Sequence, residues 1–264
     1  MAAKLSLSRA WDETRDVLRR DGRLIAIVAL AMLVFPGTVQ EMVTPQAPAG
    51  ELPAPGGWMA VALVAIVIGV VGQLAIVRLA LGPSTSVVEA IAHGARRAPY
   101  YLLSFLMWVA PFAALLVGLL GPMKGSPPSP AAALGFLVVL IAMTFLAVRL
   151  IVAVGVASAE SAGPVQILQR SWHLTAGNWW RLFAFLLLFI IAALCVLIAV
   201  GAIIGLLVAL VVGPPTGMTL SRLLVVLVSQ VAVGAVTAAF IVMIARIYLQ
   251  LSGAGGASVP KSGT

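Results

Sequence analysis

The chain has 264 residues, of which 62% are hydrophobic and only 9% are charged, and its formal net charge is +8. Soluble domains carry about 25% charged residues, so this composition excludes an ordinary water-soluble protein. Apolar stretches close to or longer than the roughly 20 residues that a helix needs to cross a bilayer recur along the chain. The sequence therefore predicts an all-α, polytopic integral membrane protein.

Six transmembrane helices are predicted, arranged as three hairpins, each preceded by a short interfacial amphipathic helix. Pro36 should kink the first of them, because proline removes a helical hydrogen bond and clashes with the preceding turn. The predicted spans are residues 22–44, 58–80, 100–121, 131–158, 181–212 and 223–251.

The same pattern divides the chain into three units within a single membrane domain over residues 1–251. The first, second and third units are pseudo-repeats at about residues 4–80, 83–158 and 163–251. Residues 252–264 are rich in Gly, Ser and Ala, which predicts a disordered tail.

An alternative for the N-terminus is a cleaved signal peptide, because the apolar run from Leu24 to Phe35 is short and residues 47–49 read Ala-Pro-Ala. The region before that run is long, however, and contains four acidic residues, which is unlike a signal peptide. We therefore expect the first span to remain part of the protein.

Basic residues are distributed unevenly between the two predicted faces of the membrane. Fourteen of the 16 Lys and Arg residues fall on the face that carries both termini, and only Lys124 and Arg222 fall on the other. The positive-inside rule then places both termini in the cytoplasm. This alternation also explains the positive net charge without a nucleic-acid partner.

The amphipathic stretch of each unit places its apolar or weakly polar residues at positions i, i+4, i+7 and i+11, which is one face of a helix. The three sets are Leu7, Trp11, Thr14 and Leu18; Val88, Ala92, Ala95 and Pro99; and Leu168, Trp172, Thr175 and Trp179. We expect these helices to lie at the cytoplasmic interface, a depth that tryptophan favours. The predicted interfacial anchors are Trp11, Trp172, Trp179 and Trp180. Alternatively, the helices only pack against the bundle as connectors.

A single arginine interrupts the second apolar run of each unit, at Arg78, Arg149 and Arg246. An arginine in a span is costly unless it reaches the interface or finds a partner, and few acidic residues lie nearby. A phospholipid phosphate can accept the paired N–H groups of a guanidinium. We therefore expect these three residues, with Arg170 and Arg181, to bind anionic phospholipid at an inward-facing site.

Residues for catalysis or metal binding are few. His93 and His173 lie in different units and Cys195 is the single cysteine, so a zinc or di-metal site lacks ligands. No phosphate loop, zincin, nucleophile-elbow or dinucleotide motif is present. We expect no metal and no cofactor, and an enzymatic role has no support in the sequence.

Residues 170–181 read RSWHLTAGNWWR and follow GPVQIL. This segment resembles the R-S-W-x-L-T-x-G-N-x-W-R signature of the bacterial membrane domain attached to some glycerophosphoryl diester phosphodiesterases, which also occurs alone in six-span proteins. The matching residues are Arg170, Ser171, Trp172, Leu174, Thr175, Gly177, Asn178, Trp180 and Arg181. The resemblance implies the membrane module of a bacterial inner-membrane protein without the catalytic barrel. Asn178 should cap the helix that follows it.

These observations favour a non-enzymatic inner-membrane protein that binds or handles anionic phospholipid or acts as a scaffold for envelope proteins. One alternative is a transporter of a small molecule or lipid, although the polar residues of the spans are too sparse to line an obvious path. They are Gln73, Ser104, Thr144, Ser229, Gln230 and Thr237. A second alternative is a membrane-embedded enzyme acting on phosphodiesters or lipids.

Overall fold

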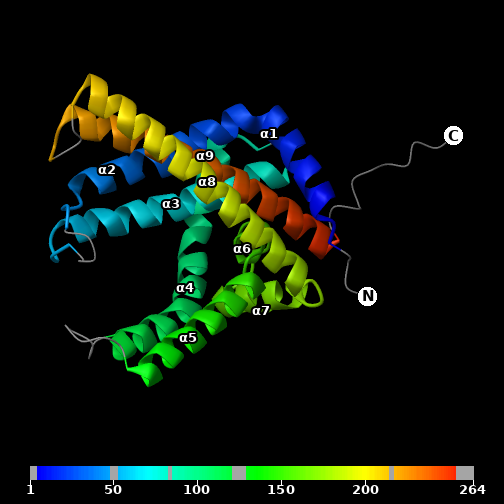
Figure 1. The fold of residues 1–264 in the computed structure, drawn as a ribbon. Coiled ribbons are helices and arrows are strands. Elements are labelled where there is room, and N and C mark those ends of the chain that lie inside the picture. The colour runs from blue at the N-terminus through cyan, green and yellow to red at the C-terminus, as the bar shows by residue number, and fades with distance from the viewer. Residues whose placement is uncertain (1–4, 48–52, 83–84, 121–128, 214–216, 254–264) are drawn as a thin grey trace.

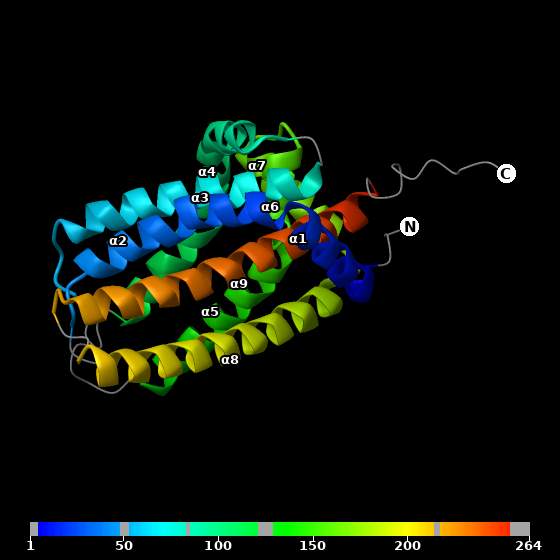
Figure 2. The same cartoon turned by 90° about the horizontal axis from the view of Figure 1, so that it is seen from above.

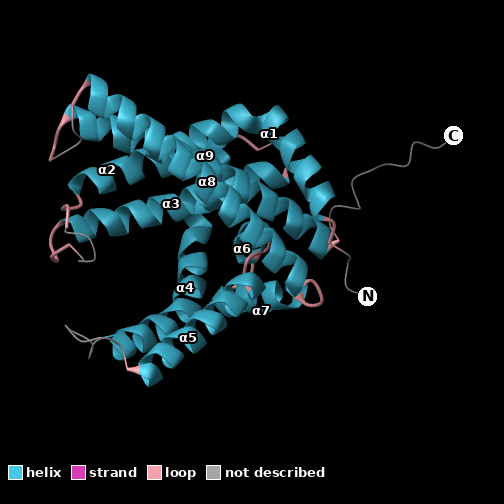
Figure 3. Ribbon diagram, in the orientation of Figure 1, coloured by secondary structure: helices cyan, strands magenta, loops and turns pink. Residues whose placement is uncertain are grey.

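The structure is a computed structural model that describes residues 5–47, 53–82, 85–120, 129–213 and 217–253. Within these residues every regular element is a helix and there is no strand (Figure 3). The elements are α1 (Leu7–Ala29), the π-helical turn η1 (Leu30–Val34), α2 (Phe35–Val43), α3 (Trp58–Leu81), α4 (Val87–Leu120), α5 (Pro130–Arg149), α6 (Ala153–Ala159), α7 (Pro164–Thr175), α8 (Trp179–Val211) and α9 (Leu220–Ser252).

Six helical segments of the described chain are long and apolar enough to cross a membrane. They are Leu7–Val43, Trp58–Leu81, Val87–Leu119, Pro130–Ala159, Trp179–Val211 and Leu220–Ser252. The prediction of an all-α multi-pass membrane protein with six candidate spans is therefore confirmed. Most of the predicted tail, residues 254–264, lies outside the described residues.

The first residues of α1 and the last residues of α9 lie at the same end of the helical bundle (Figure 1). We call this the terminal end: α1 and α8 begin there, α3 and α9 finish there, and α6 and α7 lie beside them. Helices α4 and α5 diverge from the remaining long helices toward the opposite end, whereas α8 runs along the outside of α9 (Figures 1 and 2). Arg222 lies at the opposite end, where it donates to the carbonyls of Glu41 and Thr44 at 2.8 and 3.3 Å.

The charged segments at the start of the units differ in their local structure. In the first unit the segment is continuous with the apolar helix from Leu7 onward, and α4 likewise continues through Pro99. Only in the third unit is the segment a separate helix, α7, because Gly177 adopts a φ of +80° and redirects the chain before α8. A side chain is strained at such a φ, so glycine suits this turn.

The predicted kink at Pro36 takes the form of the π-helical turn η1, which directly precedes the proline. Proline has no N–H to donate to the carbonyl four residues before it, and its ring crowds that turn. A wider turn at Leu30–Val34 relieves this conflict while the helix continues to Val43.

The predicted span at 131–158 corresponds to the candidate span Pro130–Ala159, but the helix within it is interrupted. The helix stops at Arg149, residues 150–152 form a turn, and the short helix α6 resumes at Ala153. The apolar sequence contains no proline there, so the interruption depends on contacts with other helices.

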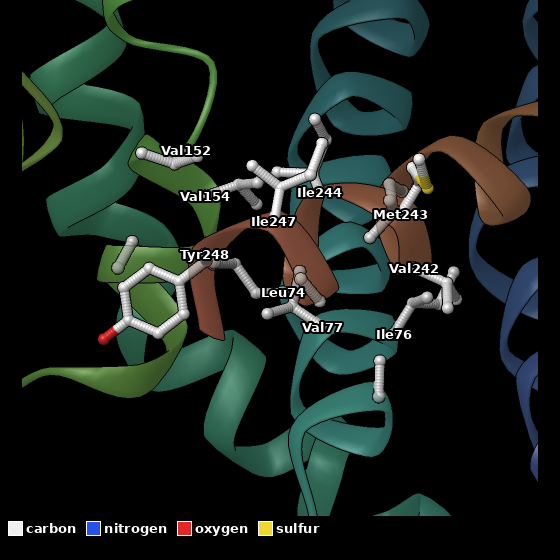
Figure 4. Packing of buried hydrophobic residues seen from close by; sticks show 14 of the residues in the cluster. Leu74, Ile76, Val77, Val152, Val154, Val242, Met243, Ile244, Ile247 and Tyr248 are labelled. Atoms are coloured by element: carbon white, nitrogen blue, oxygen red, sulfur yellow. The ribbon is translucent and has the colours of Figure 1, made fainter. Parts of the chain in front are cut away.

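The buried core lies where α3, α6 and α9 meet. Figure 4 shows Leu74 and Val77 of α3 beside Ile244 and Ile247 of α9, with Val154 of α6 close by. Close approach of α4 to α3 depends on a glycine, since a Cβ at Gly94 would lie 2.5 Å from the carbonyl oxygen of Val71. This packing fixes α6, and with it the helix interruption, against α9.

Candidate functional site

Helix α7 holds the end of α5 by two side-chain hydroxyl groups. The carbonyl oxygen of Arg149 loses its helical partner at the interruption, and it accepts hydrogen bonds from Ser171 Oγ and Thr175 Oγ1, both at 3.0 Å. Ser171 and Thr175 are fully buried. Two residues of the RSWHLTAGNWWR segment therefore cap a broken membrane helix.

The Arg149 side chain lies against aromatic rings contributed by α5 and α7. Its guanidinium carbon is 4.8 Å from the centre of the Trp172 ring and 5.5 Å from that of Phe145. Nε and NH1 are buried and have no hydrogen-bond partner among the described residues. A cation in contact with ring faces is partly stabilised, but these two N–H groups still lack an acceptor.

Arg246 has a different environment at the end of α3. Its NH2 group donates to the carbonyl oxygen of Ala80 at 2.6 Å, and Glu13, Arg20 and Asp21 of α1 lie within electrostatic range, two of them acidic and one basic. Its Nε is buried without a partner in the described chain. Arg246 is thus largely accounted for by contacts within the protein.

The three predicted span arginines are not brought together in one cavity. Arg78 is exposed on α3, whereas Arg149 contacts α7 and Arg246 contacts the end of α3. None of them lines the cavities described below. The shared inward-facing site expected from their repeated positions is therefore corrected to three separate environments, because each helix turns its arginine toward a different neighbour.

The other two predicted arginines make contacts within the protein. Arg170 forms an ion pair with Glu160, from Nε to Oε1 at 3.1 Å, and the same carboxylate oxygen accepts from the Tyr248 hydroxyl at 2.9 Å. Arg181 donates to the carbonyl oxygen of Leu5 at 3.0 Å. Both arginines remain exposed on one side, so an additional anion can still reach them.

The predicted tryptophan anchors lie at the surface or in a small aromatic cluster. Trp11, Trp172 and Trp180 are exposed, whereas Trp179 is partly buried and stacks on Phe183 with ring centres 5.1 Å apart. Exposed tryptophans at helix ends suit the membrane interface. Their depth in a bilayer stays a prediction.

Sequence reasoning missed an arginine and a histidine that bind the end of α6. Arg97 donates to the carbonyl oxygens of Ala157, Glu160 and Ala162 at 2.7 to 2.8 Å, and His93 Nε2 lies 2.8 Å from the carbonyl oxygen of Ser158. The two side chains are four residues apart on α4, which places them on one helix face. That spacing within one helix was the available signal in the sequence, since the partners of both side chains are 60 or more residues away.

Asn178 occupies the N-cap position of α8, as predicted, but its side chain does not cap that helix. Instead, its Oδ1 accepts from the backbone N–H of Leu5 at 3.5 Å. The neighbouring N–H, of Ser6, donates to Gln250 Oε1 at 3.1 Å. The start of the chain is therefore attached to the ends of α8 and α9.

A cavity of about 260 Å³ lies beside the helix interruption, between α3, α4, α5, α6, α7 and α9. Its lining is mostly apolar and aromatic, but it includes the polar residues Gln73, Tyr101, Ser104 and Thr237. Thr237 also lines a second cavity of about 190 Å³, together with Gln40 and Gln230. Four of the six span residues judged too sparse for a path thus line two neighbouring cavities.

Two further cavities, of about 420 and 340 Å³, have apolar linings along α1 and α9 and along η1, α2 and α3. No group of three or more His, Cys, Asp or Glu side chains in the described part of the chain could hold a metal ion. The arrangement can therefore offer guanidinium N–H groups at the terminal end and neutral hydrogen-bonding groups within the bundle.

Comparison with curated proteins and with solved structures gives no match. The resemblance to the membrane domain of glycerophosphoryl diester phosphodiesterases thus stays a prediction. The sequence model of one family matches residues 1–251, which include all the helices except the last residue of α9. The chain therefore belongs to that family, described as a domain of unknown function (DUF7847).

Proposed function

We propose that this protein binds an anionic phospholipid headgroup at the terminal end of its bundle, with Arg149 as the main contact. The observation that carries the proposal is the pair of buried Arg149 N–H groups, Nε and NH1, for which the described chain supplies no acceptor. Leaving a cation buried and incompletely paired is costly. An external anion would supply the missing charge and the missing acceptors.

The geometry around Arg149 supports a ligand that approaches from the membrane interface. Arg149 as a whole is only partly buried, and NH2 is not among its buried nitrogens that lack a partner. NH2 shares one edge of the guanidinium with Nε and another with NH1. A phosphate that meets NH2 could therefore accept a second hydrogen bond after a small movement of Trp172, which is itself partly exposed. Arg170, on the same helix as Trp172, is exposed but already paired with Glu160, so it could bind a phosphate only by sharing its guanidinium with that carboxylate.

The position of this site at the terminal end supports an inner-leaflet lipid as the ligand. The unequal distribution of basic residues favours a bacterial inner-membrane protein with both termini in the cytoplasm, and that leaflet carries anionic lipids. The signature resemblance supports a lipid-related role only by association. Scaffolding of envelope proteins is the alternative in which the basic surface contacts a protein.

The test compares lipids retained by the gently extracted full chain with those retained by Arg149→Ala. Native mass spectrometry should show several-fold less retained anionic phospholipid in the variant, with zwitterionic lipid unchanged. Arg96→Ala is the matched control, because Arg96 is an exposed arginine of α4 whose side chain bonds only to its own helix, at Ala92. Both variants remove one positive charge, so general electrostatic attraction falls equally.

A competition experiment distinguishes a lipid phosphate from free phosphate as the ligand of Arg149. Excess inorganic phosphate should leave the retained lipid in place if the acyl chains contribute to binding, and should displace it if Arg149 is a site for free phosphate. Equal anionic-lipid content in the wild type, Arg149→Ala and Arg96→Ala would rule out the Arg149 site and favour the scaffold. The same preparation, probed with a metal-dependent phosphodiester turnover assay, addresses the enzymatic alternative.

A further inference from the structure

The cavity beside the helix interruption combines an apolar lining with hydrogen-bonding groups that the protein does not use. Ser104 Oγ donates to the carbonyl oxygen of Tyr101 at 2.7 Å and is therefore satisfied. The side chains of Gln73, Tyr101 and Thr237, by contrast, make no hydrogen bond to any described residue. Hydroxyl and amide groups in a membrane bundle normally find partners, so their convergence on one space points to a ligand there.

The chemistry of the lining defines what could occupy this space. No charged side chain lines the cavity, so an ion would lose its hydration without gaining a counter-charge. Phe105, Trp108 and Phe240 provide aromatic surface. Gln73 and Tyr101 can both donate and accept hydrogen bonds. A neutral molecule with an apolar ring or chain and at least one hydroxyl or carbonyl group matches both properties.

We propose that the cavity between α3, α4, the α5–α6 interruption and α9 is a binding site for an uncharged amphiphilic small molecule. Gln73, Tyr101 and Thr237 would bind its polar group and Trp108 its apolar part. The site is separate from the proposed anion site, because none of the arginines lines it. Loss of lipid retention by Arg149→Ala would therefore leave this site unaffected, and the two proposals can fail independently.

The helix interruption explains why a cavity can form at this position. Ala147, Leu150, Ile151, Ala153 and Val154 all line it, and they are the residues at which α5 ends and α6 begins. A continuous helix would keep one side-chain face directed at α4 and α9 through this depth. The turn at residues 150–152 instead displaces the following segment toward α9, where α6 packs beside Tyr248 (Figure 4).

The test uses 4-bromobenzyl alcohol, a neutral amphiphile whose bromine quenches tryptophan fluorescence, added to the full chain in detergent. Binding in the cavity is measured as the part of the fluorescence quenching that is absent in the Trp108→Phe variant. We expect this component to saturate with probe concentration. 4-Bromotoluene, which cannot donate a hydrogen bond, should bind more weakly, and 4-bromobenzoate, which is charged, should give no saturable quenching.

Conservative variants then test the assigned contacts. Gln73→Leu, Tyr101→Phe and Thr237→Val should each raise the apparent Kd about fivefold to tenfold, since each removes one hydrogen-bonding group. Thr144→Val is the matched control, because the Thr144 hydroxyl donates to its own helix at Leu140 and does not line the cavity. Thermal unfolding of each variant confirms that it remains folded.

The proposal is overturned if quenching rises linearly with probe concentration and does not depend on Trp108. Such behaviour would mean that the probe only partitions into the detergent micelle. It is also overturned if 4-bromotoluene binds as tightly as the alcohol, or if Thr144→Val weakens binding as much as Thr237→Val. The first result would leave no site, and the other two would leave an apolar space without the proposed polar contacts.

Discussion

The N-terminal part of α1 and helix α7 share a sequence pattern but contact their neighbours differently. Thr14 and Thr175 occupy equivalent positions in the two segments, and both are buried. The Thr14 hydroxyl donates to the Ala10 carbonyl of its own helix at 2.7 Å and lies 3.3 Å from the Met243 sulfur. The Thr175 hydroxyl lies 2.9 Å from the corresponding carbonyl of its own helix, at Ser171, and it also lies 3.0 Å from the Arg149 carbonyl of another helix.

This difference follows from the helix that each segment covers. Helix α9, beside α1, continues without interruption through Arg246, so its backbone needs no external partner. Helix α5 ends at Arg149, so its last carbonyl needs one. The same apolar face with a buried threonine can therefore pack against a continuous helix or complete a broken one. Which outcome occurs depends on a partner far away in the sequence.

The span arginines of the two regions, Arg246 and Arg149, also have different environments. Near α1, Arg246 has a carbonyl acceptor on α3 and acidic residues within electrostatic range. Near α7, Arg149 has two aromatic rings and no acidic partner in the described chain. Of the two regions, the one around α7 therefore has the cation that lacks an acidic partner, and it is the region where we propose that an external anion binds.

The largest expected effect comes from removing both hydroxyls that cap α5. The double variant Ser171→Ala and Thr175→Val removes both hydroxyl donors to the Arg149 carbonyl, which should lower the free energy of unfolding by about 2 to 4 kcal/mol. Thr14→Val removes an equivalent hydroxyl from α1 but leaves no broken helix end, so it should cost less than about 1 kcal/mol. Thermal unfolding in one detergent measures both. Similar losses for the two variants would contradict the proposed difference.

The length and apolarity of the runs were enough to predict the spans, because both are local properties of the sequence. The second and last predicted spans, 58–80 and 223–251, lie within α3 and α9 and leave out at most three residues at one end. The interruption at residues 150–152 could not be predicted, since Leu, Ile and Val there carry no helix-breaking signal. The interrupted backbone is satisfied by hydroxyls of α7, which come from another part of the chain.

The candidate sites were less predictable than the fold. The sequence identified Arg149 and Trp172 separately, but their contact depends on how α5 and α7 pack. Gln73 and Thr237 are 164 residues apart, so the sequence gives no sign that they are neighbours. In the structure both line the same cavity. Contacts between distant helices decide both sites, and no spacing within one helix encodes them.

The second prediction compares the two arginines directly. Arg246→Met removes a charged hydrogen bond and leaves the Ala80 carbonyl without it, so unfolding free energy should fall by about 1.5 to 3 kcal/mol. Arg149→Met removes a cation with unpaired N–H groups and keeps an apolar chain, so lipid-free protein should be unchanged or more stable by about 1 kcal/mol. Unfolding experiments in detergent, after removal of bound lipid, measure whether each variant is less or more stable than the wild type. A clear loss for Arg149→Met would show that its partners lie within the protein.

The third prediction concerns the turn that separates α7 from α8. Gly177→Ala places a side chain at a φ of +80°, which should lower the free energy of unfolding by about 1 kcal/mol. Gly22→Ala in α1 is the control, because a Cβ there meets nothing within 4 Å and the helix favours alanine, so stability should rise slightly. Equal effects at the two glycines would contradict the role of this turn in making α7 a separate helix.

The smallest expected effect distinguishes the tryptophans of the two segments. Trp172→Leu removes the ring over Arg149 and should lower the free energy of unfolding by about 0.5 to 1 kcal/mol. Trp11→Leu is matched in chemistry and exposure, 52% against 38%, but Trp11 contacts no arginine or aromatic ring among the described residues, so its loss should be smaller. In the Arg149→Met background, Trp172→Leu should cost less than in the wild type, because the cation is gone and only the edge contact of Trp172 with the Phe145 ring remains. If the cost of Trp172→Leu is the same with and without Arg149, the ring stabilises α7 by packing alone, and the guanidinium gains nothing from it.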